Sequence, residues 1–225
     1  MPEVNADTAA PRVGGERPIR TVVFDLGGVL IDWDPRHLYR RLFDDEDEME
    51  RFLAEVATME WNRQQDAGRP WLEAIADLVA AHPHHQARIE AYRERWLEML
   101  AGPITESLAV LSDVRAAGLS VYALSNWSAE TFPLARDAYP FLDSFDGVLI
   151  SGEVGVVKPD PRIFELLIER FALVPQETVF VDDQPVNVTA ASQLGFRALQ
   201  FQDAAGLRRD LEALGALVAS GPDRP

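Results

Sequence analysis

Polar side chains that could carry chemistry stand directly after short apolar runs in this sequence. They are Asp25, Ser125, Asn126, Asp182 and Asp183. The preceding runs are rich in β-branched and aromatic residues, which is typical of strands buried on both faces. A carboxylate at the end of such a strand must reach solvent, pair with a cation or bind a metal, because an isolated buried charge is too costly. Asp25 is therefore the first candidate for chemistry, with an Asp that caps a turn as the alternative.

The carboxyl ends of parallel strands share one edge of a sheet, and ligands bind at this edge in open α/β folds. Lys158, which follows a Gly-rich stretch, is expected at the same edge. Carboxylates brought together need a cation, and oxygen ligands without a nearby His or Cys suit a hard ion such as Mg²⁺. A lysine and a hydroxyl suit a phosphoryl group, and an Asp carboxylate can form an aspartyl-phosphate that water hydrolyses.

The apolar pattern predicts an α/β fold in which a five-stranded, parallel, Rossmann-like sheet has helices on both faces. Strands are expected over 20–25, 119–124, 145–150, 178–181 and 196–201. Helices are expected over 104–114, 128–138, 163–173, 187–194 and 204–219, with a Gly-rich loop over 151–157. The stretch 36–101 has four amphipathic helical stripes and no strand signal, which predicts an inserted helical-bundle cap.

The same pattern gives the boundaries of the parts. A disordered tail is expected at 1–18, the α/β core at 19–34 and 102–202, the helical cap at 35–101, and a C-terminal helix and tail at 203–225. A length of 225 residues suits one core with a small insertion.

The composition limits the partners and the location. A net charge of −16 argues against nucleic acid and anionic membranes, because both require a basic surface. No apolar run is long enough to span a bilayer, and residues 1–18 lack an apolar signal core, so the cytoplasm is the expected location. A chain without cysteine has neither disulfides nor thiolate chemistry. The expected partner is a small-molecule phosphate ester, and the oligomeric state stays open.

Four short motifs together resemble those of a known family. They are Asp25-Leu-Gly-Gly-Val-Leu, Leu124-Ser-Asn, Lys158-Pro and Val181-Asp-Asp-Gln-Pro-Val-Asn187. In this order they resemble the motifs of the haloacid-dehalogenase-like hydrolase superfamily, and the helical insertion after the first motif is similar to its helical cap. The resemblance covers roughly residues 20–202 and extends to the sugar-phosphate phosphatases and 2-haloacid dehalogenases of that superfamily.

The resemblance implies a role for each matched residue. Asp25 would be the nucleophile and a Mg²⁺ ligand, and the carbonyl of Gly27 and the carboxylate of Asp183 would be further ligands. Ser125 and Lys158 would act in catalysis, Ser125 by holding phosphoryl oxygens and Lys158 by stabilising negative charge.

Four more residues would assist these groups. Asn126 and Gly28 would help to bind the substrate, and Asp182 and Asn187 would support the site through water or hydrogen bonds. The activity that the resemblance implies is Mg²⁺-dependent hydrolysis of a phosphoric monoester, a small phosphometabolite, through an aspartyl-phosphate.

Gly27 departs from the superfamily's pattern. Most of its phosphatases have a second Asp there as general acid and base, and a positioned acid contributes about 10²–10⁴ in rate. Three functions stay open. The first is a phosphatase for substrates whose leaving groups have low basicity, such as sugar 1-phosphates. The second is a metal-independent 2-haloacid dehalogenase that uses Asp25, and the third is a non-catalytic protein that binds a phosphometabolite or a protein partner. The acidic pair at 182 and 183 favours the phosphatase, because without Mg²⁺ it would repel an anionic haloacid.

The cap contributes candidates for substrate specificity. Trp61, Asn62, Asp66 and Arg69 flank Gly68 between two expected cap helices. Arg69 could bind an anionic substrate group, and Asp66 could supply the missing proton. A plain helix–helix turn with one ion pair is the alternative.

Simpler interpretations are favoured for the other polar groups. The histidines of the segment 82–85 could bind a transition metal, but solvated loop histidines beside a proline are the simpler case. The acidic run 44–48 is expected to begin a helix, where the helix dipole favours negative charge. Asp32 and Asp34 are expected in a turn and a helix cap, and Trp127 is expected to pack between cap and core.

Overall fold

The central sheet has five parallel strands, and the computed structural model describes residues 17–218. The strands are β1 (Thr21–Phe24), β4 (Ser120–Ser125), β5 (Gly147–Ile150), β6 (Thr178–Asp182) and β7 (Arg197–Gln200). Their order is β5-β4-β1-β6-β7, and Val22 of β1 pairs with Val121 of β4 and Val179 of β6. The predicted five-stranded parallel sheet is confirmed. Residues 1–16 of the tail expected at 1–18, and residues 219–225 of the C-terminal part expected at 203–225, lie outside the described residues.

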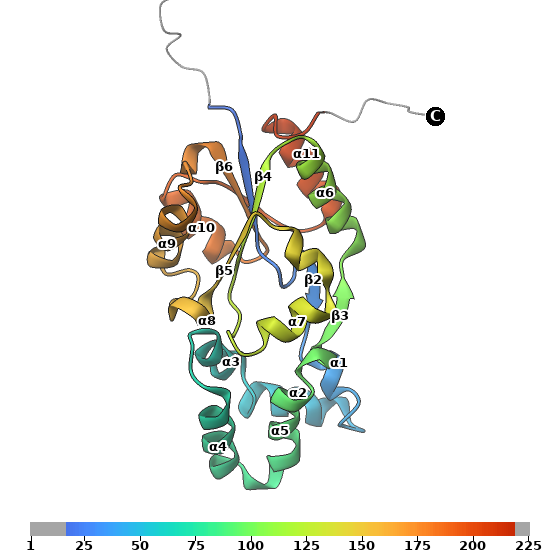
Figure 1. Cartoon of the computed structure of the whole chain (residues 1–225). Coiled ribbons are helices and arrows are strands. Elements are labelled where there is room, and N and C mark those ends of the chain that lie inside the picture. The colour runs from blue at the N-terminus through green and yellow to red at the C-terminus, as the bar shows by residue number, and fades with distance from the viewer. Residues whose placement is uncertain (1–16, 219–225) are drawn as a thin grey trace, which may run out of the picture.

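Helices cover both faces of the sheet (Figure 1). The helices α6 (Thr105–Ala116) and α11 (Ala204–Ala213) lie on one face, and α9 (Pro161–Phe171) and α10 (Pro185–Gln193) lie on the other. Successive strand residues point to opposite faces, so Phe24 packs in the same cluster as Leu111 and Leu211, whereas Val23 packs with Phe164. Because both faces of β1 are apolar, its reactive residue stands only at its end.

Three expected elements differ from the structure by more than two residues. The helix α7 (Phe132–Ala138) begins later than residue 128, and α11 ends at Ala213 because Gly215 adopts a φ of 69°. The loop expected over 151–157 begins instead with a short helix, α8 (Ser151–Val154). Gly152 lets α8 touch the loop after β4, since a Cβ would collide with backbone atoms of Trp127 and Ala129. Gly152 is therefore needed for close packing, and it does not indicate a loop.

Five helices and two 3₁₀ turns form the cap region. They are α1 (Arg36–Tyr39), α2 (Glu46–Glu55), α3 (Met59–Asp66), α4 (Trp71–Ala81), α5 (Gln86–Glu94) and the turns Pro83–His85 and Trp96–Met99. They gather beyond the carboxyl end of the sheet, away from the chain termini (Figure 1). The ring of Tyr92 packs against Tyr39, Trp61 and Trp71 at centroid distances of 6.0, 5.1 and 5.6 Å. The division of the chain into domains at 35 and 101 stays a prediction.

A two-stranded ribbon joins the core to the cap region. The strand β2 (Ile31–Trp33) pairs antiparallel with β3 (Leu100–Pro103). The prediction of helix throughout 36–101 is therefore wrong at residues 100–101. Both strands are too short to show alternation, and their pairing is not local, so periodicity along the chain could not reveal it.

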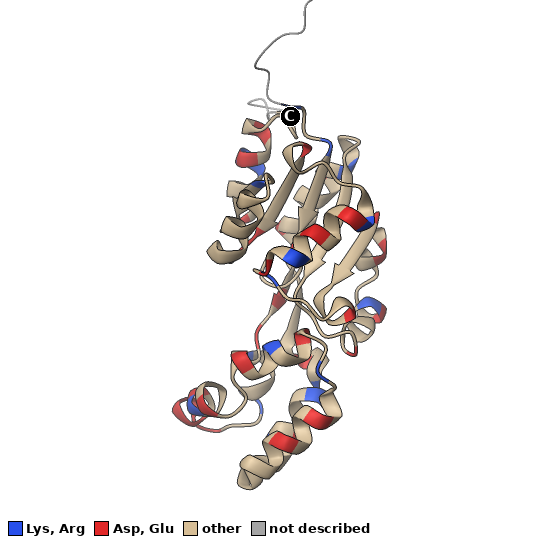
Figure 2. Ribbon diagram, turned by 90° about the vertical axis from the view of Figure 1, so that its left-hand side faces the viewer, with Lys and Arg blue, Asp and Glu red and all other residues tan. Residues whose placement is uncertain are grey.

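Acidic residues recur on helices of both the core and the cap region (Figure 2). The run 44–48 begins α2: the Asp45 side chain accepts a hydrogen bond from the Glu48 N–H at 2.8 Å, and the first turn is acidic. The expected helix start is confirmed, and the helix dipole stabilises it. Within residues 17–218, no helix is both long and apolar enough to cross a bilayer.

Candidate active site

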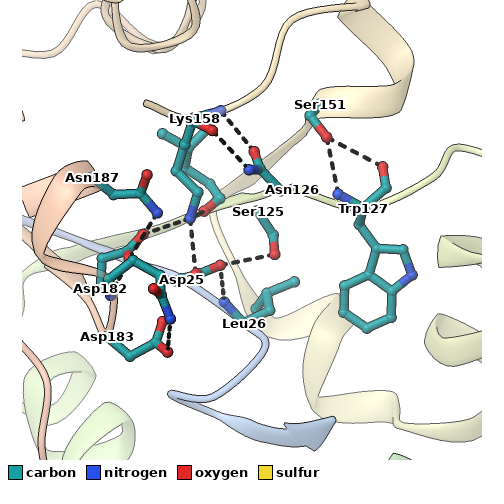
Figure 3. Close-up of polar contacts among 12 residues, drawn as sticks. Asp25, Leu26, Ser125, Asn126, Trp127, Ser151, Lys158, Asp182, Asp183 and Asn187 are labelled. Carbon is teal, nitrogen blue, oxygen red and sulfur yellow. Dashed lines mark hydrogen bonds and ion pairs between the residues drawn. The ribbon is translucent and has the colours of Figure 1, made fainter. Parts of the chain in front are cut away.

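Asp25 follows β1 directly, and both of its carboxylate oxygens have partners (Figure 3). Its Oδ1 accepts hydrogen bonds from the backbone N–H of Leu26 at 2.7 Å and from Oγ of Ser125 at 2.8 Å. Its Oδ2 lies 2.9 Å from Nζ of Lys158. The backbone N–H of Asp25 donates to the carbonyl of Val181 at 2.8 Å, which continues the pairing of β1 with β6. The strand ends therefore fix the position of this carboxylate.

Lys158 is the only lysine of the chain, and it is buried. Its Nζ lies 2.9 Å from Asp25 Oδ2, 2.7 Å from Asp182 Oδ2 and 2.9 Å from the carbonyl oxygen of Leu124. These three acceptors match the three protons of an ammonium group. Lys158 is therefore fully paired between the ends of three strands.

The side-chain amide of Asn126 holds the backbone of Lys158. It donates to the carbonyl of Lys158 at 3.0 Å and accepts from the N–H of Lys158 at 2.8 Å. Asn126 was expected to help to bind the substrate, which either its backbone or its amide could do. Because the amide is occupied, only the backbone of Asn126 is left for that role.

The acidic pair after β6 divides into a buried and a half-buried carboxylate. Asp182 is inaccessible, and its Oδ1 accepts from the backbone N–H of Gln184 and from Nδ2 of Asn187, both at 2.9 Å. Since Lys158 occupies its Oδ2, Asp182 has little capacity for another ligand. Asp183 lines the cavity described below, with one hydrogen bond at 2.6 Å from Nε2 of Gln184. Asp183 is thus the carboxylate that a metal ion can reach.

The turn after Asp25 brings its backbone close to Asp183. Gly28 has a φ of 74°, and a Cβ there would lie 3.0 Å from Oδ2 of Asp183. Glycine is therefore required at position 28. At Gly27, by contrast, a Cβ would meet no atom within 4 Å, so this position opens into the cavity.

The charges of this cluster do not balance. Burial raises the pKa of Asp25 to about 7, while Lys158 opposes the shift and Asp182 adds to it. Burial also raises the pKa of Asp183. Burial alone would lower the pKa of Lys158, but the two carboxylates beside it outweigh this effect and raise it. One ammonium among three carboxylates leaves two negative charges when all are ionised.

The donor set fits a hard divalent cation. Asp25 and Asp183 each offer an oxygen to the cavity, and these atoms and an oxygen of Asp182 behind them lie within 4.8 Å of one another. Oxygen ligands and an excess of negative charge suit Mg²⁺. Within residues 17–218 no other three His, Cys, Asp or Glu side chains are so placed, the histidines at 82–85 included.

A cavity of about 630 Å³ lies between the sheet edge and the cap region. From the core it is lined by Asp25, Gly27, Gly28, Ser125, Asn126, Trp127, Lys158, Asp183, Gln184 and Asn187. From the cap region and the ribbon it is lined by Trp33, Met59, Glu60, Asn62, Arg63, Asp66 and Trp96. The structure thus brings together the residues expected at the strand ends, with Asp182 behind them.

The structure does not bring Arg69 to this cavity. Its guanidinium donates to Oε1 of Gln64 at 2.7 Å and pairs with Asp77, so it belongs to the plain helix–helix turn that was the alternative. Arg63 lines the cavity instead. The Arg63 side chain is exposed and has no hydrogen-bond or ion-pair partner among residues 17–218.

Sequence reasoning missed Arg63, although a signal was present. The cavity-lining residues of α3 are Met59, Glu60, Asn62, Arg63 and Asp66. Four of them follow the spacing i, i+3, i+4, i+7, which places them on one face of a helix. This spacing could have identified the four residues as one surface of the cavity. Nothing in the sequence indicated that Trp33 and Trp96 also line the cavity.

Of the remaining sequence candidates, Trp127 lies as expected, whereas Asp32 lies in β2 and not in a turn, and Asp34 precedes Pro35, the N-cap of α1. Oδ1 of Asp32 lies 3.0 Å from Nε2 of His37, and Oδ1 of Asp34 accepts from the Arg36 N–H at 2.8 Å. Neither carboxylate lines the cavity. The ring of Trp127 packs 5.2 Å from that of Trp96, between core and cap, and both line the cavity.

Comparisons with known proteins point to one family. A family model described as haloacid dehalogenase-like hydrolase matches residues 19–195. The D-ribitol-5-phosphate phosphatase of Bacteroides thetaiotaomicron is 24% identical over 208 residues, which cover 87% of this chain and 98% of the relative. The (S)-2-haloacid dehalogenase 4A of Burkholderia cepacia is 25% identical over 199 residues, which cover 81% and 82%.

A solved structure has the same fold with its ligands present. It is a HAD family enzyme from Bacteroides thetaiotaomicron in complex with magnesium and inorganic phosphate, 25% identical, with a TM-score of 0.64 over 84% of this chain and 98% of that chain. The matched segment spans the strand ends that meet at Asp25, Lys158 and Asp183. This chain therefore belongs to the haloacid dehalogenase-like hydrolase family.

Proposed function

We propose that this protein is a Mg²⁺-dependent phosphoric monoester hydrolase that acts on a small phosphometabolite through an aspartyl-phosphate at Asp25. The observation that carries this proposal is the contact of Asp25 with Ser125 and Lys158 at the cavity, beside carboxylates whose charge exceeds that of the lysine. The phosphatase among the relatives and the magnesium–phosphate complex of the related enzyme support it. A cytoplasmic location stays a prediction.

The position of Asp25 at the cavity suits attack by its carboxylate. One oxygen of Asp25 would form a bond to phosphorus while the bond from phosphorus to the leaving oxygen breaks. The Ser125 hydroxyl donates to Asp25 at 2.8 Å and can turn its proton to a phosphoryl oxygen, with Gly28 and Asn126 also at the cavity. Lys158 compensates charge on Asp25 and on the phosphoryl group, because it is already fixed at 2.9 Å. Water then hydrolyses the aspartyl-phosphate.

Asp25, Asp183 and the carbonyl of Gly27 are the groups that would hold Mg²⁺. When bound, the ion would neutralise phosphoryl charge and orient the group for attack. Asp182 and Asn187 would hold Lys158 in position, since Asn187 binds Asp182 and Asp182 binds Lys158.

The cap side of the cavity would contact the leaving group. Trp33, Met59 and Trp96 offer apolar surface, whereas Asn62 and Arg63 offer polar groups. Such a mixed lining is typical of sites for small metabolites. Arg63 would take the anion-binding part that the sequence suggested for Arg69.

One observation favours a 2-haloacid dehalogenase as the second candidate. Halide leaves without a proton, so the lack of a carboxyl at Gly27 would not matter, and a relative is named for this activity. However, the excess negative charge beside Asp25 would repel an anionic haloacid. The phosphatase is therefore the preferred function.

The test measures phosphate release from a panel of phosphate esters, with Mg²⁺ and with a chelator, beside halide release from 2-chloropropionate. We expect Mg²⁺-dependent phosphate release that Asp25→Asn abolishes. Asp32→Asn is the matched control, because Asp32 contacts His37 outside the cavity. Metal-independent halide release would establish the dehalogenase instead. Silence in both assays, with a phosphate ester raising the Tm, would indicate a non-catalytic binding protein.

A further inference from the structure

Among residues 17–218, the carboxyl groups that line the cavity are Asp25, Glu60, Asp66 and Asp183. Asp25 and Asp183 are committed to the nucleophile and the metal in the proposed function. Glu60 is exposed in the first turn of α3. Asp66, the last residue of α3, is the half-buried carboxyl of the cap side. It is the one cavity carboxyl that is both sheltered and without an assigned role.

The reaction needs a proton donor that the sheet edge does not supply. An alkoxide leaves phosphorus slowly unless its oxygen is protonated, and a positioned acid contributes about 10²–10⁴ in rate. Gly27 has no side chain, and the three protons of Lys158 Nζ bind Leu124, Asp25 and Asp182. A residue on the cap side of the cavity must therefore deliver the proton, or bulk water must.

We propose that Asp66 is the general acid and base of the reaction, an inference that rests on the proposed function. When the bond between phosphorus and the leaving oxygen breaks and Asp25 bonds to phosphorus, the Asp66 carboxyl gives its proton to the leaving oxygen. In the second step, water bonds to phosphorus, its proton passes to the Asp66 carboxylate, and the bond from Asp25 to phosphorus breaks. Inorganic phosphate leaves, and both side chains return to their starting forms.

A chain of hydrogen bonds within the cap positions the Asp66 side chain. Nδ2 of Asn62, one turn earlier in α3, donates to Oδ2 of Asp66 at 2.9 Å. Oδ1 of Asn62 in turn accepts from the hydroxyl of Tyr92 on α5 at 3.1 Å. Tyr92 is buried, so the amide of Asn62 has a fixed orientation that presents its N–H₂ to Asp66.

Asp66 is also tied to the core next to the phosphoryl-binding end of the cavity. The backbone N–H of Ser128, in the loop after β4, hydrogen-bonds to the Asp66 carboxyl. The backbone carbonyl of Asp66 accepts from Oγ of Ser151 at 2.6 Å, and the same Oγ accepts from the Trp127 N–H at 2.9 Å. Ser125, which contacts Asp25, ends the strand that leads into this loop. The acid and the nucleophile are therefore positioned by one segment, 125–128.

The protonation behaviour of Asp66 suits both roles. Burial raises its pKa to about 7, and the Ser128 N–H opposes this only in part. A carboxyl with this pKa is present in both forms near neutral pH, as a group that donates and then accepts a proton must be. Tyr92, the titratable neighbour on α5, stays neutral because burial raises its pKa well above the ordinary value.

The test compares wild type with Asp66→Asn on 4-nitrophenyl phosphate and phenyl phosphate, both with Mg²⁺. The nitrophenolate leaves with little help, whereas the more basic phenolate needs a proton. We expect Asp66→Asn to lower kcat about 100-fold with phenyl phosphate and less than about threefold with 4-nitrophenyl phosphate. The activity kept on the nitrophenyl ester shows that the variant is folded and binds phosphate. With phenyl phosphate, the wild-type rate should also fall as the pH rises through about 7, and the variant should lack this limb.

Three outcomes would overturn the proposal. An equal loss on both esters would mean that Asp66 only ties the cap to the loop after β4. A selective loss in Glu60→Gln, with none in Asp66→Asn, would make Glu60 the acid. If the wild type releases phosphate from neither ester nor the wider panel, the proposed function fails as well, whereas an active wild type confines the failure to Asp66.

Discussion

The sheet side and the cap side of the cavity use their polar groups differently. On the sheet side, Asp25, Lys158 and Asp182 are each less than a tenth exposed, and Lys158 lies 2.9 and 2.7 Å from the two carboxylates. On the cap side, Glu60 and Arg63 are exposed, and neither side chain has a hydrogen-bond or ion-pair partner among residues 17–218. One side is internally satisfied, and the other has groups left for a ligand.

This difference separates two tasks. A satisfied cluster holds the reacting groups in place before the substrate arrives, so that little reorganisation is needed during the reaction. Unpaired groups on a helix can instead bind whatever part of the substrate reaches them. Changes on the sheet side should therefore alter stability and kcat, and changes to the unpaired groups of the cap side, Glu60 and Arg63, should alter KM and the choice of substrate.

Lys158→Met should have the largest effect, because it leaves Asp25 and Asp182 buried without their cation. Removing one partner of a buried ion pair costs about 3–5 kcal/mol of unfolding free energy. Urea unfolding measures this loss, and Arg162→Met, which removes only exposed ion pairs on α9, should cost less than about 1 kcal/mol. The loss in Lys158→Met should shrink at acid pH, because the carboxylates can then take up protons. Similar small losses in both variants would contradict the charge balance inferred for the sheet side.

Asp183→Asn should weaken Mg²⁺ binding at least about tenfold, because it removes a charged oxygen ligand from the cluster. The single lysine offers a readout that needs no activity. Lysine labelled at Cε gives one NMR signal, from Lys158, and this signal should shift as Mg²⁺ binds beside Asp25. Asp32→Asn should titrate as wild type does. An unchanged Mg²⁺ titration in Asp183→Asn would mean that Asp183 is not a ligand.

The sheet side could be predicted from sequence because two local signals coincide there. Apolar, β-branched runs mark the strands, and a polar residue follows each run, as Asp25 follows β1 and Asp183 follows β6. The alternation of strands and helices then implies parallel strands, which brings these ends together. The partners of Lys158 could not be predicted in detail, because they depend on side-chain geometry across three strands.

The cap side could be predicted only in part, because its contacts depend on how α3 is turned. Trp61 and Gln65 of α3 are buried in the cap, whereas Arg63 faces the cavity. Amphipathic spacing identifies the helix but does not say which neighbour its polar face meets. Arg69, which follows α3, pairs with Asp77 of α4. The sequence alone could not distinguish this ion pair from a role of Arg69 in binding the substrate. The ribbon of β2 and β3 escaped notice for a related reason, since its pairing is not local.

Arg63→Ala and Arg69→Ala form a matched pair within the cap. Removing a charged contact to substrate costs about 1.5–3 kcal/mol, so Arg63→Ala should raise KM roughly tenfold or more, with kcat changed less. Arg69→Ala should leave KM unchanged, because its guanidinium binds Gln64 and Asp77 outside the cavity. Steady-state kinetics on the best ester of the panel measure both. The reverse order of effects would restore Arg69 as the anion-binding residue and would mean that the cap closes differently on substrate.

Asp66→Asn should change how the stability of the protein depends on pH. The pKa of Asp66 rises from an ordinary 3.8 to about 7 on folding, because the carboxyl is buried. Between these values the native state binds more protons than the unfolded state, so this group destabilises the wild type progressively as the pH rises. Asparagine cannot ionise and lacks this term, so the variant should gain up to about 4 kcal/mol relative to wild type between pH 4 and pH 8.

The measurement for Asp66→Asn is the difference in unfolding free energy between variant and wild type at several pH values. Altered hydrogen bonds with Asn62 and Ser128 would shift this difference by a constant of about 1 kcal/mol, whatever the pH. Only the pH-dependent part reports the buried carboxyl. A difference that stays flat from pH 4 to pH 8 would mean that Asp66 is ionised throughout, like an exposed carboxylate. Asp66 would then behave like its exposed neighbours on α3, and the cap side would have no sheltered acid.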